Sequence, residues 1–182
     1  MSTISLAASL PWLELGRKPP LSVEDFRFSC SGILPATEFQ DLERLLEGGL
    51  GPYATAFGRS WAALENQIRN ECARKRDPGL KSGFWMHKGY SVQAARFVME
   101  AFHQETPMKR EWLLDKGRFA LLEELIGLDH LGVERVLAFA GQLRLVHRWD
   151  AFDAQRGRER FRALVDRAVE AALNERRTSN VE

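Results

Sequence analysis

The chain has 182 residues, of which 45% are hydrophobic and 28% are charged, so it can bury a sizeable core without disulfides or a structural metal. Its 26 basic and 25 acidic residues nearly cancel, which excludes a strong overall attraction to nucleic acid or anionic lipid. The two cysteines lie far apart with no CxxC, so they predict neither a disulfide framework nor a zinc site and favour a reducing compartment.

The N-terminal stretch 6–10 is apolar but does not have the features of a secretory signal. No Lys or Arg precedes it, and Pro11, Glu14 and Arg17 interrupt it. No other stretch approaches the about 20 apolar residues that span a bilayer. We therefore expect a cytoplasmic protein that meets a membrane only through a partner.

The first half of the chain predicts three helices. Segment 4–15 has no decisive period and is expected to be irregular; a short helix begins at Ser22 and a second at Pro35. The third helix carries the clearest apolar stripe, and Glu65 with Arg69 forms a helical pair four residues apart, worth only about 0.2–0.5 kcal/mol. The stripe consists of Phe57, Trp61, Leu64, Ile68 and Cys72.

The second half predicts four more helices. A fourth begins at Ser91, and a fifth spans Met108 to Ile126 with two opposite apolar stripes, which predicts that it is sandwiched between neighbours. A sixth helix carries Val133, Val136, Leu137, Ala140 and Leu143. A seventh begins near Asp153 and presents an apolar face expected to pack: Ala154, Phe161, Leu164, Val165, Ala168 and Ala172.

No segment combines strict alternation with hairpin turns, so no sheet is expected. The sequence predicts a single all-α domain of about seven helices over residues 1–175, built as two packed helical halves with a seam near 79–90. Residues 176–182 lack apolar periodicity and are expected to form a frayed tail.

Few residues suggest catalysis or metal binding. Glu100 and His103 form Glu-x-x-His, half of the motif that di-metal helical bundles use, but no second copy is present. His147 falls on the apolar stripe of the sixth helix and is expected to be a satisfied core or boundary histidine. The sequence has no phosphate-binding loop and no nucleophile motif, so we expect neither a cofactor nor an enzyme.

Two basic clusters, at 74–76 and 156–162, raise the alternative of nucleic-acid binding. On the second, acidic residues lie among the arginines, whereas a nucleic-acid footprint is usually a basic stripe. A solvated surface of mixed charge is the favoured interpretation, and no nucleic-acid partner is expected.

Four ordered blocks of residues, from Ser9 to about Asp166, resemble a known family. They are Ser9-Leu10-Pro11 with Lys18-Pro19-Pro20-Leu21-Ser22, Glu24, Phe26 and Cys30; Trp61, Glu65, Arg69-Asn70 and Ala73-Arg74; Glu111, Leu114-Asp115, Arg118, Glu123-Glu124-Leu125 and His130; and Ala138, Leu143, Arg148-Trp149, Asp153, Gly157 and Phe161. The family consists of uncharacterised bacterial proteins whose genes occur in V/A-type ATPase operons.

The resemblance implies a non-enzymatic helical subunit or accessory factor of a V/A-type rotary ATPase. The family is distantly similar to the C (or d) subunit of these ATPases, a soluble all-α protein that couples the central shaft to the membrane ring. The resemblance implies other ATPase subunits as partners and carries over no catalytic, cofactor or metal residue. The alternatives are a metal-dependent helical-bundle enzyme using Glu100 and His103, and a nucleic-acid adaptor.

Four residues are candidates for contact with a partner. Trp12, Trp85 and Trp149 lie in or beside connectors, and Arg148 precedes Trp149; exposed Trp with Arg is typical of binding hot spots. Alternatively, these rings cover helix ends. In the join 148–153, Trp149 and Phe152 are expected to wedge the sixth and seventh helices, with Asp153 as cap and Gly157 allowing close approach.

Overall fold

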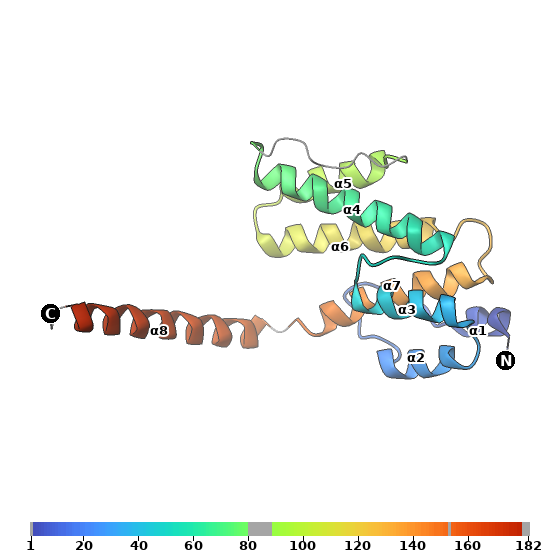
Figure 1. The fold of residues 1–182 in the computed structure, drawn as a ribbon, viewed down its shortest axis with the longest axis horizontal. Helices are drawn as coiled ribbons and strands as arrows, with labels where there is room; N and C mark the ends of the chain where they lie inside the picture. Colours follow the sequence, from blue (N-terminus) through green and yellow to red (C-terminus); the bar gives the residue numbers. More distant parts are fainter. Residues whose placement is uncertain (1, 80–88, 153, 180–182) are drawn as a thin grey trace.

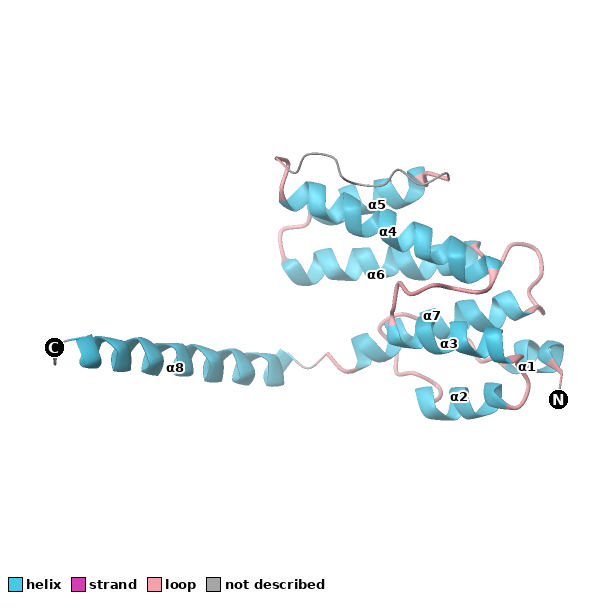
Figure 2. Ribbon diagram, in the orientation of Figure 1, coloured by secondary structure: helices cyan, strands magenta, loops and turns pink. Residues whose placement is uncertain are grey.

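A computed structural model of the chain describes residues 2–79, 89–152 and 154–179, and within these ranges it contains eight helices and no strand (Figures 1 and 2). The predicted all-α fold is confirmed. The helices are α1 (Thr3–Ser9), α2 (Val23–Ser31), α3 (Ala36–Glu47), α4 (Ala56–Arg76), α5 (Val92–Phe102), α6 (Pro107–Glu124), α7 (Val133–Asp150) and α8 (Ala154–Ser179).

Helix α1 corrects the prediction of extended or irregular structure for the first part of segment 4–15, whereas residues 10–15 lie outside any helix, as predicted. The Ser2 hydroxyl accepts a hydrogen bond from the backbone N–H of Ser5 and so caps the helix. Leu6 and Ala7 are buried, and α1 packs against α7. Two turns are too short to show a period, and the helix depends on this tertiary contact.

The helices form two layers, and α7 lies in one of them and contacts the other. Figure 1 shows α4, α5 and α6 together on one side and α1, α2, α3 and α7 on the other. Ten of the 18 residues of α7 are buried, and α7 contacts α1, α3, α4 and α6. At Gly141 a side chain would collide with Leu122 of α6, so this glycine permits the close approach of α6 and α7.

Most of the predicted seam near 79–90 lies outside the described residues, which have a gap at 80–88. Helices α4 and α5, which flank residues 80–88, pack against each other within the same half. The chain crosses between the halves at 48–55 and 125–132. At the first crossing, fully buried Asp41 of α3 accepts hydrogen bonds from the backbone N–H groups of Ala54 and Thr55, at 3.0 and 2.7 Å.

Helix α6 is sandwiched as predicted, because it packs against α5 on one side and α7 on the other. Leu114, Leu121 and Leu122 are buried. The two opposite apolar stripes are therefore both covered, which confirms the prediction made for this helix.

Helix α8 contradicts the packing predicted for the seventh helix. It extends away from the two layers, and every residue from 157 to 170 is exposed (Figure 1). Phe161, Leu164, Val165 and Ala168 are therefore not core residues, because an apolar period defines a face but not the surface that covers it. In the part of the chain that the structure describes, no other segment comes within 4 Å of the position that a Cβ on Gly157 would occupy, so the predicted close approach there is wrong.

The ends of α8 also bear on the sequence predictions. The helix continues to Ser179, past Arg176, where the frayed tail was expected to begin. The predicted cap, Asp153, lies outside the described residues. Among the described helices, none is both long and apolar enough to cross a membrane.

Candidate functional site

A network of ion pairs links α4, α6 and α7, and it begins at Glu65. This carboxylate is buried in α4, with only 8% of its side chain exposed, and it pairs with Arg118 of α6. Arg118 donates from Nε to Oε2 at 2.8 Å and from Nη2 to Oε1 at 3.2 Å, a two-pronged contact. Arg69 donates to Oε1 at 2.9 Å from the exposed side.

The network continues through Asp115, which is fully buried on α6. Its Oδ1 accepts from Arg118 at 3.0 Å, and its Oδ2 accepts from Arg148 at 2.8 Å and from the Trp149 indole N–H at 3.0 Å. Arg148 also donates to Glu111 at 3.1 Å. Acidic and basic side chains therefore alternate from Arg69 to Glu111 across three helices.

The charges of Glu65 and Arg118 are stabilised at neutral pH. Burial alone would raise the pKa of Glu65, but Arg118 and Arg69 outweigh it, and the pKa is lowered. Burial alone would lower the pKa of Arg118, but Glu65 and Asp115 outweigh it, and the pKa is raised. Glu65 and Arg118 remain charged near neutrality, as structural ion pairs do, rather than exchanging protons as catalytic groups do.

The sequence predicts a helical pair of Glu65 and Arg69 but does not indicate the stronger partner, Arg118. That partner lies 53 positions away in the sequence, so no local spacing points to it. One signal could have found it: the network residues Glu65, Arg69, Glu111, Asp115, Arg118, Arg148 and Trp149 all belong to the blocks that carry the family resemblance.

Trp149 occupies a different place from the one predicted. Its half-buried ring meets Trp112 of α6 edge-on, with centroids 4.9 Å apart, and stacks on Phe152 at 5.2 Å. With the bond to Asp115, these contacts attach the end of α7 to α6. The predicted wedge between the sixth and seventh helices is wrong, because α8 leaves the bundle at this point.

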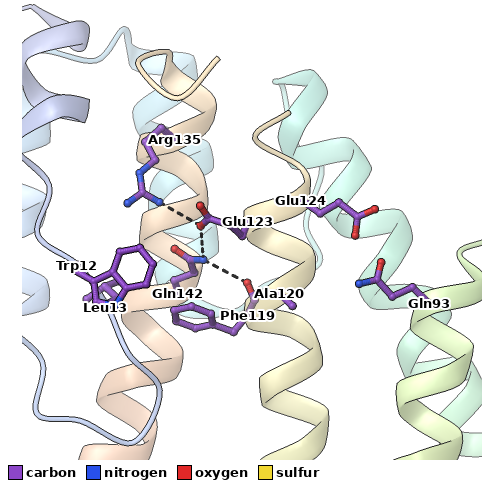
Figure 3. Close-up of a pocket in the computed structure, with 9 residues that line it drawn as sticks. All are labelled: Trp12, Leu13, Gln93, Phe119, Ala120, Glu123, Glu124, Arg135 and Gln142. Atoms are coloured by element: carbon purple, nitrogen blue, oxygen red, sulfur yellow. Dashed lines mark hydrogen bonds and ion pairs between the residues drawn. The ribbon is translucent and has the colours of Figure 1, made fainter. Parts of the chain in front are cut away.

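Trp12 lies at a separate site, an open pocket of about 470 Å³ lined by α6, α7, the connector after α1 and Gln93 of α5 (Figure 3). It exposes 81% of its surface at the pocket wall, while the adjacent Leu13 is buried. Glu123 accepts hydrogen bonds from Arg135 at 3.3 Å and from Gln142 at 3.0 Å. These three polar groups bind one another, so this side of the pocket offers an apolar contact surface beside a paired Glu123 and Arg135.

The connector after α1 links this pocket with the region around Trp149. Its Leu13 lines the pocket, and at Gly16 the chain turns with a φ of 86°, where a side chain would collide with the ring of Trp112. The structure thus brings Arg148 and Trp149 together and leaves Trp12 at the pocket. Trp85 lies outside the described residues.

The Glu100–His103 pair is not assembled into a metal site. Both residues are exposed; Glu100 pairs with Arg96 at 3.0 Å, and His103 Nδ1 lies 2.8 Å from the carbonyl oxygen of Met99. Within the described ranges, no group of three or more His, Cys, Asp and Glu side chains is placed to hold a metal ion.

His147 confirms the prediction of a satisfied boundary histidine. Its ring is half-buried, and Nε2 lies 3.0 Å from the carbonyl oxygen of Leu21. This contact fixes the end of the connector against α7.

Comparison with known families shows a similarity in the second half of the chain. A model of the family described as "Protein of unknown function (DUF2764)" matches residues 89–172, from the start of α5 into α8. Neither the curated proteins nor the solved structures include a match to this chain. The matched segment contains Asp115, Arg118, Arg148 and Trp149, so the α6–α7 part of the ion-pair network lies within the similarity to this family.

Proposed function

We propose that this chain is a non-enzymatic helical accessory protein of a V/A-type rotary ATPase that binds another protein of the complex through the surface around Trp12. The observation that carries the binding role is a large aromatic side chain that is almost fully exposed beside an apolar pocket. Tryptophans in such places are frequent hot spots of protein interfaces.

The surroundings of Trp12 favour this role. Leu13 is buried and Leu10 and Leu15 pack against the core, so the connector that carries the ring is held on both sides. A ring on a fixed backbone loses little conformational entropy when a partner covers it. Glu123 and its partner Arg135 would form part of a polar rim around that contact, with Glu123 also held from inside by the buried Gln142.

The ATPase assignment depends on the sequence resemblance. It is supported by the convergence of three of the four resembling blocks in one ion-pair network, which indicates that the blocks describe one structural unit. Coupling of the central shaft to the membrane ring, as in the C (or d) subunit, is the specific role that the resemblance implies.

The test is capture of ATPase subunits by the tagged chain from its native cells, with quantification by mass spectrometry. Trp12→Ala should reduce the captured subunits by about tenfold or more, because loss of a hot-spot side chain costs about 2 kcal/mol. Phe28→Ala on α2 is the matched control, since Phe28 is equally exposed, at 82%. Both variants should melt like the parent chain.

Two outcomes would contradict this proposal. If no ATPase subunit is enriched over an untagged control, the ATPase assignment is wrong. If Trp12→Ala and Phe28→Ala capture the subunits equally well, the binding surface lies elsewhere.

A further inference from the structure

Helix α8 presents an apolar face that no part of the bundle covers. Phe161 and Leu164 are 68% and 62% exposed, and Val165 and Val169 are also exposed. At about 100° per residue, these side chains and Ala168 share one side of the helix. Exposure of such an apolar face to water costs free energy, so the face indicates a binding surface.

Most charged residues of α8 lie outside this face; Arg158, at about 60° from Phe161, lies on it between Val165 and Val169. Arg160 and Arg162 lie at its two borders, about 100° to either side of Phe161, and Arg167 lies beside Arg160. The acidic residues occupy the opposite side, about 140–180° from Phe161; they are Glu159, Asp166 and Glu170. Arginine stems can extend along the apolar face and carry their charge to whatever surface it meets.

We propose that α8 binds the surface of an anionic phospholipid bilayer, lying parallel to it with Phe161 and Leu164 in the interface. A basic amphipathic helix with its arginines bordering the apolar face has the composition of such interfacial helices. The site is separate from the Trp12 surface, so this inference does not depend on the ATPase assignment.

The pattern favours a lipid surface over a partner helix. A coiled coil needs large apolar residues at both seam positions of each heptad, but here the seam through Phe161 and Leu164 also contains Gly157 and Ala168. Coiled coils also pair opposite charges at the borders of the seam, whereas both borders of this face carry arginine. A bilayer requires apolar area and positive charge without a fixed spacing.

The acidic side of α8 would weaken this attraction only in part, because the arginines outnumber the acidic residues. A helix is about 10–12 Å across, and the Debye length at physiological salt is about 8 Å. The carboxylates on the far side would lie only roughly 3–5 Å further from the lipid phosphates than the arginines at the borders do, which is less than the Debye length, so they offset part of the attraction. Over residues 154–179 the sequence carries seven arginines against four acidic residues.

The test is flotation of the full chain with vesicles of 70% phosphatidylcholine and 30% phosphatidylserine, beside pure phosphatidylcholine vesicles, at physiological salt. We expect binding to the anionic vesicles at least tenfold tighter than to the neutral ones. Arg160→Gln with Arg167→Gln should weaken anionic binding by about tenfold or more, because each arginine near the surface contributes about fivefold.

Adjacent residues provide a matched pair for the apolar face. Leu164→Glu and Ala163→Glu each add one negative charge to α8, but Ala163 lies on the polar side and is exposed. Leu164→Glu should reduce binding by tenfold or more, and Ala163→Glu by less than threefold. Circular dichroism should show both variants folded, since neither side chain is buried in the bundle.

Several outcomes would overturn the proposal. Absence of binding to the anionic vesicles would do so, as would equal losses from Leu164→Glu and Ala163→Glu. A dimer that forms without lipid and is abolished by Leu164→Glu would assign the face to a second copy of the chain instead. Trp12→Ala should leave vesicle binding unchanged, so failure here is distinguishable from failure of the ATPase proposal.

Discussion

At the scale of single residues, Glu65 connects two guanidinium groups within the bundle. Glu65→Gln removes the charge that Arg118 faces and leaves that largely buried arginine with Asp115 alone, so it should lower the free energy of unfolding by about 3 kcal/mol. Glu100→Gln is the matched control, because its partner Arg96 is exposed and the change should cost less than about 0.5 kcal/mol. Urea denaturation measures both, and equal losses would contradict a special role for Glu65.

Two buried carboxylates make the fold sensitive to acid. Burial would raise the pKa of Asp41, but the amides of Thr55 and Ala54 and the Arg44 side chain outweigh it and lower the pKa, as Arg118 does for Glu65. A lowered folded-state pKa stabilises the fold above the unfolded value of about 4, and this stability is lost as the pH falls through the folded value.

Urea denaturation between pH 3 and 7 tests this expectation. The free energy of unfolding should be nearly constant near neutrality and fall below about pH 4.5. In Glu65→Gln the decline should be shallower, because one of the carboxylates with a lowered pKa is gone. A variant with the acid dependence of the parent chain would show that Glu65 has an ordinary pKa.

At the scale of elements, Trp149 holds the end of α7 against α6. Trp149→Ala should cost about 2 kcal/mol, less than the about 3–5 kcal/mol of a fully buried aromatic, because the ring is only half-buried. Trp149→Phe keeps most ring contacts and loses the donor to Asp115, so about 1 kcal/mol is expected. Thermal denaturation compares them with exposed Trp12→Ala, and a Trp149→Ala variant as stable as that control would refute the anchoring role.

The N-terminal ends of the helices show where local sequence signals are enough to predict a helix start. Ser22, Thr55, Ser91 and Thr106 each accept a hydrogen bond from a backbone N–H in the first turn, so these four starts are encoded within a few residues. Helix α1 has a cap as well, but its seven residues show no period and it depends on burial against α7. Short elements therefore escape prediction even when their caps are present.

At the scale of the whole molecule, α8 and the bundle should be energetically independent. Removal of residues 153–182 should change the free energy of unfolding of the remaining chain by less than about 0.5 kcal/mol, because residues 157–170 are exposed. Denaturant unfolding followed by tryptophan fluorescence measures this, since all five tryptophans precede residue 153. A loss above about 1 kcal/mol would show that α8 packs on the bundle in solution.

The sequence by itself determined the all-α class, most helix positions, the sandwiching of α6 and the role of His147, because periodicity and caps act between residues within a few turns. Only the tertiary structure decided which faces are covered. It paired Glu65 with Arg118 across 53 positions, placed the two crossings between the halves at 48–55 and 125–132, and left the apolar face of α8 open. These outcomes depend on which surfaces meet in three dimensions, and the period of a single helix carries no information about its partner.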